Sequence, residues 1–354
     1  MKKTGIIYSR RFLLHKTGEG HPESPRRLRA IMHGIKTSRL LDDERFILIE
    51  PQSATLETLQ LVHPPEFINR IREFCRRGGG IFEEETETVL SLESFEVARL
   101  AAGGALKAVE MVMNGKIKNA FVASRPPGHH ASSTHTFGFC VFNNIALAAK
   151  YLVENFSLSR ILILDIDSHS GDGTQSIFYD TDKILYIGLH EDPSEFPRAG
   201  FLDEVGEDEG LGYTVNIPLP FGTTDSAYWK AMKLIVMPIA MQYKPEFILI
   251  SAGFDGYFRD LIGNLYLSAY IFLRIFQVML NFAHLFSRDR IVAILEGGYR
   301  SNFLRRIVPA IIARMAGIDA EIRDDRPFFN VEAQKKAEKV IEEVKEMHSR
   351  FWKL

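Results

Sequence analysis

Short runs of apolar residues recur along the 354-residue chain and alternate with segments of helical periodicity. Several runs are nearly continuous in Ile, Leu and Val, which is the pattern of strands covered on both faces in a parallel sheet. The predicted strands are Gly5–Tyr8, Arg45–Glu50, Ala120–Ala123, Ile161–Asp165, Ile184–Leu189, Thr214–Ile217, Phe247–Ser251 and Ile291–Leu295. The predicted helices are Pro25–Lys36, Ser94–Asn114, Asn143–Glu154, Ser226–Gln242 and Ser268–Phe286. This alternation predicts an α/β fold, with a doubly wound, mostly parallel eight-stranded sheet and helices on both faces.

The chain has no internal repeat and no low-complexity linker. We therefore expect one domain over residues 1–354, although length alone would allow two. The charged tail carries apolar residues at helical spacing, namely Val340, Val344, Met347 and Phe351. These residues predict a C-terminal helix at about 331–354 that packs its apolar stripe on the body of the protein.

The composition argues against several kinds of partner. The formal net charge is −2, so direct nucleic-acid binding, which needs a basic patch, is not expected. The apolar run near the N-terminus is too short for a signal peptide, and no window has about 18 uninterrupted apolar residues, so no membrane association is expected. Only two cysteines occur, Cys75 and Cys140, which fits a reducing cytosol. The sequence predicts a soluble, cytoplasmic protein and leaves its oligomeric state open.

The fourth predicted strand ends in the segment ILILDIDSHSGDG, which covers residues 161–173. Its polar residues Asp165, Asp167 and His169 are spaced two apart, so on a continuing strand they would project from the same face. Two carboxylates and an imidazole would then converge at the carboxyl edge of a parallel sheet, where such sheets hold their ligands. Burying two carboxylates is costly without compensation, and a divalent metal is the simplest compensation.

Polar side chains also follow three other predicted strands. These are His129 and His130 after the third strand, Asp255 after the seventh, and Glu296 and Tyr299 after the eighth. Taken singly, each has a structural explanation, such as a turn-forming aspartate or a packing tyrosine. Together they supply what a catalytic zinc site needs, because Asp167, His169 and Asp255 provide three ligands. The two histidines would then be free to transfer protons.

Seven motifs of this sequence resemble, in the same order, those of the histone deacetylase superfamily, which includes bacterial and archaeal histone deacetylase-like amidohydrolases and acetylpolyamine amidohydrolases. The motifs are HPESPRR, VHPPEFI, SRPPGHHA, GFCVFNNIALAA, DIDSHSGDGTQ, SAGFDGY and EGGY, and they cover roughly residues 15 to 300. The resemblance implies an arginase/deacetylase-like fold. It also implies a zinc-dependent hydrolase of linear amide C–N bonds, which removes acetyl or a similar small acyl group from acyl-lysine or a related acylamine.

The same resemblance assigns roles to the residues at matching positions. The implied zinc ligands are Asp167, His169 and Asp255. The implied catalytic residues are His130 as general base and then acid, His129 as its electrostatic partner, Asp172 and Asp165 as the carboxylates paired with His130 and His129, and Tyr299 as the donor to the scissile carbonyl. The implied substrate channel contains Phe139 and Phe196, which face each other, with Gly138 in its wall and Ile262 at its rim.

The sequence departs from the family pattern at two positions near the implied metal. Ser170 replaces the second histidine of the metal motif, so we expect zinc to bind through His169 with different local packing. Gly188 stands where many members carry a serine whose hydroxyl helps to bind a structural potassium ion, which leaves that site open.

Three alternatives stay open. The rim residue Ile262 is apolar where polyamine-specific relatives carry an acid, which favours acyl-lysine over acetylpolyamine, although nearby loops could supply acids. A zinc-containing acylamide-binding protein without turnover is a second alternative. An arginase-type hydrolase with two manganese ions is a third, but it needs more bridging carboxylates than are placed here. Zinc and ferrous iron are not distinguished by the sequence.

Overall fold

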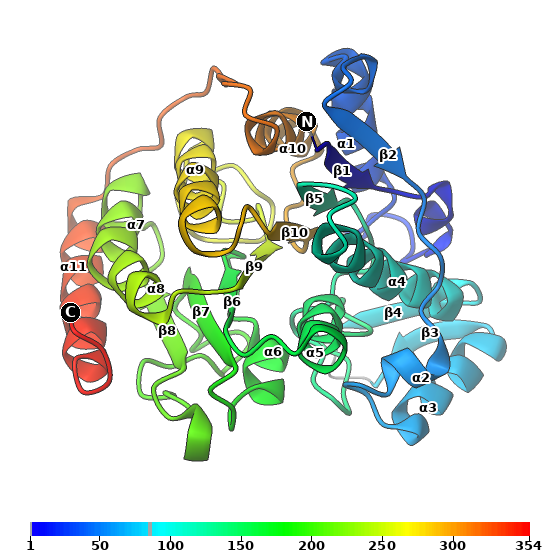
Figure 1. The fold of residues 1–354 in the computed structure, drawn as a ribbon, viewed down its shortest axis with the longest axis horizontal. Coiled ribbons are helices and arrows are strands. Elements are labelled where there is room, and N and C mark those ends of the chain that lie inside the picture. The colour runs from blue at the N-terminus through cyan, green and yellow to red at the C-terminus, as the bar shows by residue number, and fades with distance from the viewer. Residues whose placement is uncertain (1, 84–86) are drawn as a thin grey trace.

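A computed structural model describes residues 2–83 and 87–354. Its centre is an eight-stranded sheet in which every neighbouring pair is parallel, in the order β2-β1-β5-β10-β9-β6-β7-β8 (Figure 1). These strands are β1 (Thr4–Ile7), β2 (Phe46–Ile49), β5 (Asn119–Val122), β6 (Ile161–Asp165), β7 (Ile184–Glu191), β8 (Thr214–Leu219), β9 (Phe247–Ala252) and β10 (Ile291–Leu295). All eight predicted strands are confirmed, with ends shifted by a few residues.

Helices cover both faces of the sheet (Figure 1). They are α1 (Arg26–Thr37), α2 (Leu56–Leu59), α3 (Pro65–Arg76), α4 (Ser94–Met113), α5 (Asn144–Phe156), α6 (Asp172–Ile177), α7 (Asp225–Ala231), α8 (Met237–Tyr243), α9 (Ala269–Phe286), α10 (Ser301–Met315) and α11 (Val331–His348). The predicted helix Ser226–Gln242 consists of α7 and α8 joined by a π-helical turn, Met232–Val236. Helices α2, α3, α6 and α10 were not predicted.

The central strands are apolar throughout because both of their faces are buried. In β6, Ile161 and Ile163 belong to the core beneath α4 and α5. Leu162 and Leu164 alternate with them and belong to the core on the opposite face, with α9 and α10. Successive side chains of a strand point to opposite faces, so a strand with helices on both sides needs an unbroken apolar run.

A small antiparallel ribbon of β3 (Gly79–Phe82) and β4 (Thr88–Ser91) lies apart from the main sheet and was not predicted. Two glycines in β3 weaken the strand pattern, which explains the omission.

The charged C-terminal segment forms α11, which packs against α7 and the edge strand β8 (Figure 1). Its buried side chains include Ala337, Ile341 and Val344. A helix in this place shields one edge of the sheet from pairing with another chain. The extent of the domain, 1–354, stays a prediction.

Within the described residues, one helix, α9, is long and apolar enough by length and composition to cross a membrane. Half of that stretch is buried inside the protein, where it packs on β9, β10 and α10. The core helix of a globular protein meets the same criterion, so α9 is explained by its packing.

Candidate metal centre and catalytic cavity

The loops that follow β5, β10, β9 and β6 meet at the carboxyl edge of the sheet. These four strands are direct neighbours and parallel, so their carboxyl ends lie side by side. The loops carry every polar side chain that was singled out at the predicted strand ends. The sheet order therefore brings together residues that lie up to 170 positions apart, His129 and Tyr299 being the extremes.

Asp167, His169 and Asp255 form a buried group whose ligand atoms all lie within 4.8 Å of one another. The Nδ1 atom of His169 is 3.2 Å from Asp167 Oδ1 and 3.2 Å from Asp255 Oδ2. The structure thus brings the three expected metal ligands together around one point.

Asp165 does not join this group. Strand β6 ends at Asp165, and the chain then turns, so Asp167 and His169 lie in a loop and not on the strand. The Asp165 carboxylate is 3.0 Å from His129 Nδ1 through Oδ2 and accepts the Asp167 backbone N–H through Oδ1. The expectation that all three residues project from one face of a strand is therefore wrong.

The three grouped residues fit a divalent cation. The buried Oδ2 atom of Asp255 has only the His169 Nδ1 atom near it, at 3.2 Å, and that nitrogen is shared with Asp167. Burial, and then the negative charge of Asp167, raise the pKa of Asp255 to about 7. Gly297 leaves room for the group, since a Cβ there would lie 2.4 Å from Asp255 Oδ2. Two buried carboxylates and an imidazole nitrogen are ligands that zinc accepts.

The two adjacent histidines each contact a carboxylate through Nδ1. His130 Nδ1 is 2.6 Å from Asp172 Oδ1, at the start of α6, while His129 contacts Asp165. Burial, and then the neighbouring His129, lower the pKa of His130 to about 4, so His130 is neutral at neutral pH. Burial alone would lower the pKa of His129, but the charges of Asp167 and Asp165 outweigh it and raise the pKa to about 10.

Tyr299 follows β10 and lines the same cavity as His130. Its backbone N–H donates to Asp260 Oδ2 at 2.7 Å, and the Arg27 guanidinium lies 5.0 Å from the centre of its ring. Burial raises the pKa of the phenol well above its ordinary value. The hydroxyl therefore keeps its proton and can donate it in a hydrogen bond.

A cavity of about 250 Å³ opens above these groups and is lined by all the predicted channel residues, Gly138, Phe139, Phe196 and Ile262. The ring stacked directly on Phe196 is that of Phe137, with centroids 4.9 Å apart, while Phe139 packs at right angles to Tyr299. Gly138 must be a glycine, because a Cβ there would lie 2.4 Å from the His130 ring and because its φ is +48°.

Several carboxylates of this cavity were missed in the sequence. Glu87, Asp192 and Glu195 line its outer part and are exposed. Glu191 is buried at the end of β7, accepts hydrogen bonds from Ser168 Oγ and Asn264, and has Oε1 3.8 Å from His169 Nε2. Its place at the end of a predicted strand is the signal that would have found it.

The two departures from the family pattern have local explanations. Ser170 is buried beside Gly200, where a Cβ would lie 2.2 Å from Ser170 Oγ, so the Gly200 loop packs tightly against this small side chain. Gly188 lies beside Tyr186, whose hydroxyl would be 2.9 Å from a Cβ at position 188. The phenol therefore borders the space of the missing serine hydroxyl, and potassium binding stays a prediction.

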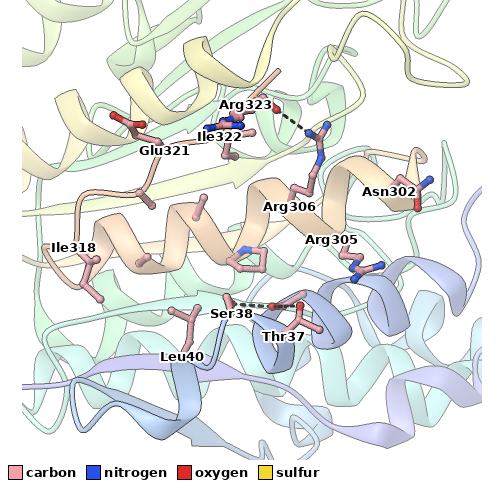
Figure 2. A pocket seen from close by; sticks show the side chains of 15 residues that line it. Thr37, Ser38, Leu40, Asn302, Arg305, Arg306, Ile318, Glu321, Ile322 and Arg323 are labelled. Atoms are coloured by element: carbon pink, nitrogen blue, oxygen red, sulfur yellow. Dashed lines mark hydrogen bonds between the residues drawn. The ribbon is translucent and has the colours of Figure 1, made fainter. Parts of the chain in front are cut away.

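A larger cavity of about 930 Å³ lies elsewhere, between α1 and α10 and beneath residues 318–323 (Figure 2). Three of its four charged residues are arginines, and Arg306 is engaged by the backbone carbonyl of Arg323 and by Asp324. Among the described residues that line it, there is no group of buried acids or histidines. This cavity is therefore not the candidate catalytic site, although it is the larger of the two.

Comparison with known proteins defines the class to which this fold and site belong. Residues 21–315 match the histone deacetylase domain. A crystal structure of the HDA15 HD domain superimposes with a TM-score of 0.89 at 32% identity, covering 99% of this chain and 96% of the other. The eight-stranded fold is therefore that of a deacetylase domain.

Relatives of known sequence define the family to which the chain belongs. A probable deacetylase of Archaeoglobus fulgidus is 39% identical, over 99% of each chain. A probable deacetylase of Methanothermobacter thermautotrophicus is 38% identical over 89% of this chain and 91% of its own, and a histone deacetylase-like amidohydrolase of Pseudomonas aeruginosa is 33% identical over 88% and 82%. The chain belongs to the histone deacetylase family, whose members are metal-dependent hydrolases of amides.

Proposed function

We propose that this protein is a zinc-dependent deacetylase that removes acetyl, or a similar small acyl group, from acyl-lysine side chains, with His130 as general base and acid. The observation that carries the proposal is the juxtaposition of two features. A buried group of Asp167, His169 and Asp255, in which one imidazole nitrogen contacts both carboxylates, lies beside the neutral His130, whose Nδ1 atom is held by Asp172. The cytoplasmic location is part of the same proposal.

Asp167, His169 and Asp255 would hold the zinc ion. When bound, zinc polarises the acyl carbonyl and lowers the pKa of a bound water molecule toward about 7. Gly297 N donates to Asp167 Oδ2 at 2.7 Å, so this carboxylate is already oriented by the backbone. Ferrous iron would be held by the same ligands.

His130 then moves the proton. The contact with Asp172 fixes the proton of His130 on Nδ1 and leaves the Nε2 lone pair free to accept one from the attacking water. The protonated His130 is stabilised by Asp172 and donates the proton to the leaving amine. His129 keeps its own proton because of the charges of Asp167 and Asp165, and it adds positive charge near the reaction centre.

The Tyr299 hydroxyl would donate a hydrogen bond to the acyl oxygen as negative charge develops there. The Asp260 carboxylate and the Arg27 guanidinium hold this residue from two sides, so the donor is fixed before the reaction. Donors of this kind are worth about 10²–10³ in rate when they are aimed at a developing oxyanion.

The shape of the cavity favours a slender apolar chain that ends in the acyl amide. Phe139 and Phe196 supply aromatic walls, and Ile262 supplies an apolar contact. An acylated lysine side chain, with its methylene stem, matches such a cavity.

An acetylpolyamine is the second candidate, and the outer carboxylates support it. Glu87, Asp192 and Glu195 surround the opening, so the argument from the apolar Ile262 is weaker than the sequence suggests. A second ammonium group of a polyamine, or a basic residue beside an acyl-lysine, would both be attracted to these acids.

The proposal is tested by measuring acetate release from an acetyl-lysine peptide and from acetylputrescine by the zinc-loaded protein. We expect turnover of the peptide, and a loss of about 10²–10³-fold in kcat for Tyr299→Phe. A strong preference for acetylputrescine would select the second candidate. If neither these substrates nor a simple ester is hydrolysed, and Tyr299→Phe behaves like the unchanged protein, the protein binds acylamides without turnover and the proposal fails.

A further inference from the structure

A second group of metal-ligating side chains lies next to the group of Asp167, His169 and Asp255. His129, Cys140 and Glu296 are all buried, and one ligand atom of each lies within 4.8 Å of the other two. Neither the sequence comparison nor the proposed reaction gives Cys140 or Glu296 a role. The three residues come from the loop after β5, from the following GFCVF segment and from the end of β10.

Glu296 is the first reason to expect a ligand here. Its Oε2 atom accepts the backbone N–H groups of Gly128 and His129 at 2.7 and 3.2 Å. Its Oε1 atom is fully buried and has no hydrogen-bond partner in the described structure. A buried carboxylate oxygen without a partner is costly, and a cation would relieve that cost.

His129 is already oriented as a ligand. Its Nδ1 atom contacts Asp165, which leaves Nε2 as the ring nitrogen available to bind a cation. A histidine whose second nitrogen is held by a carboxylate is the usual arrangement of a metal-binding histidine. The Nε2 atom is 3.8 Å from Asp167 Oδ1, so the second group borders the first.

Cys140 supplies the third ligand. Its Sγ atom is 3.5 Å from the backbone oxygen of Gly138, to which the thiol donates. Burial, and then the negative charge of Glu296, raise the pKa of this thiol. A thiol that stays protonated beside an unpaired carboxylate is a site where a cation replaces a proton.

No side-chain cation in the described structure pairs with the free Glu296 oxygen. The Arg27 guanidinium pairs with Glu23 and reaches Glu296 only through the backbone oxygen.

We propose that His129, Cys140 and Glu296 form a second, weaker zinc site, and that zinc bound there inhibits the enzyme. On binding, the Cys140 thiol and His129 Nε2 give up their protons to solvent as bonds from sulfur and nitrogen to zinc form, and no group is oxidised or reduced. The bound ion takes the Nε2 lone pair of His129, whose ring centroid lies 4.0 Å from that of His130, and so removes this side chain from its place beside the general base. The sulfur ligand favours zinc over manganese or magnesium, which prefer oxygen.

Cobalt is the probe that tests the site, because a thiolate ligand gives cobalt an intense near-ultraviolet charge-transfer absorption and the oxygen and nitrogen ligands of the first group do not. Metal-free protein is titrated with Co²⁺, and bound metal is counted by elemental analysis. We expect a second equivalent to bind together with the appearance of this absorption. In Cys140→Ser the absorption should be absent, and affinity for the second equivalent should fall by about tenfold or more.

Two further variants complete the design. Cys75 is the other buried cysteine and lies in α3, so Cys75→Ser is the matched control and should keep the absorption. Glu296→Gln retains an acceptor for the two backbone N–H groups but offers a weaker ligand, so it should weaken the second equivalent while the absorption persists at higher cobalt.

Inhibition is measured separately, as the Zn²⁺ concentration that halves each variant's own maximal activity. That concentration should be about tenfold higher in Cys140→Ser than in the unchanged protein and in Cys75→Ser. Saturation at one equivalent, or a charge-transfer absorption that survives in Cys140→Ser, overturns the second site. Equal zinc inhibition in all variants overturns its inhibitory role. Because the cobalt titration needs no substrate, failure of the proposed deacetylase function would be seen independently.

Discussion

Two clusters of buried charged residues lie close together in this protein and behave in opposite ways. In the first, Glu23 pairs with Arg125 through two contacts of 2.8 and 2.6 Å and with Arg27 at 3.3 Å. In the second, the two carboxylates of Asp167 and Asp255 share a single nitrogen, the Nδ1 atom of His169, at 3.2 Å each.

The pKa values record the difference. Burial would raise the pKa of Glu23, but Arg125 outweighs it and holds that pKa well below its ordinary range. Burial and Asp167 raise the pKa of Asp255 to about 7. A charged cluster whose members satisfy one another serves the fold, whereas two carboxylates that share one imidazole lack a full counter-charge and leave room for a cation. The first cluster also supports the second, because Arg27 donates to the backbone oxygen of Gly298, next to Tyr299.

The largest expected effect comes from removing a charge from the unsatisfied cluster. Asp255→Asn should lower kcat/KM for an acetylated peptide by about 10³-fold or more, because a metal ligand is lost. The melting temperature of the metal-free protein should rise or stay equal, since repulsion with Asp167 is relieved. Calorimetry of metal-free protein beside the activity measurement checks both. A fall of several degrees would mean that Asp255 serves the fold, like Glu23.

The same kind of substitution in the satisfied cluster should act on stability. Glu23→Gln leaves Arg125 and Arg27 buried without their counter-charge, which should lower the free energy of unfolding by about 3–5 kcal/mol. Denaturant unfolding measures it. The exposed pair of Arg39 and Asp42 provides the control, since Asp42→Asn should change stability by less than about 1 kcal/mol. If Glu23→Gln lowers stability no more than Asp42→Asn does, the buried cluster of Glu23 does not serve the fold, and the distinction between the two clusters is lost.

The sequence predicted the strands and the unsatisfied cluster better than the satisfied one, and the reason is physical. Continuous apolar runs mark strands buried on both faces, and residues at the ends of parallel strands must meet, so Asp167, His169 and Asp255 could be placed together without coordinates. The contact between Arg125 and Glu23 joins positions 102 residues apart in loops, where no periodicity reports on pairing.

Finer assignments depended on how the chain runs after a strand ends. The spacing of Asp165 and Asp167 suggests one face, and only the turn after β6 separates Asp165, which contacts His129, from Asp167. Helix α10 contains Pro309, a residue that argues against a helix interior, yet its packing against α1 and α9 overrides that preference.

A third kind of buried titratable group sharpens the comparison, because His348 has neither a partner nor a ligand. Both of its ring nitrogens are buried without hydrogen bonds in the described structure, and burial lowers its pKa to about 4. The unfolded chain, with an ordinary pKa near 6.5, then binds the proton more readily than the folded protein. Stability should therefore fall as the pH drops from about 6.5 to 4, by at most about 3 kcal/mol from this residue.

His348→Leu isolates that contribution, because the other buried histidines remain. Urea unfolding at several pH values between 7 and 4 should show a shallower decline for the variant than for the unchanged protein. If the free energy of unfolding declines equally in both proteins, His348 has a hydrogen-bond partner in solution. A buried polar group without a partner would then not be sufficient reason to expect a ligand.

The smallest effect is expected from the exposed carboxylates at the opening of the cavity, because water already solvates their charges. Glu195→Gln should raise KM for a positively charged acetylated substrate by no more than about fivefold and leave kcat unchanged, because exposed charges contribute at most about 1 kcal/mol. The difference should shrink as salt is added, since exposed charges are screened. A neutral acylamide is the control and should be unaffected. An equal rise in KM for both substrates would show that Glu195 shapes the opening and does not attract charge, which would remove the electrostatic support for the acetylpolyamine candidate.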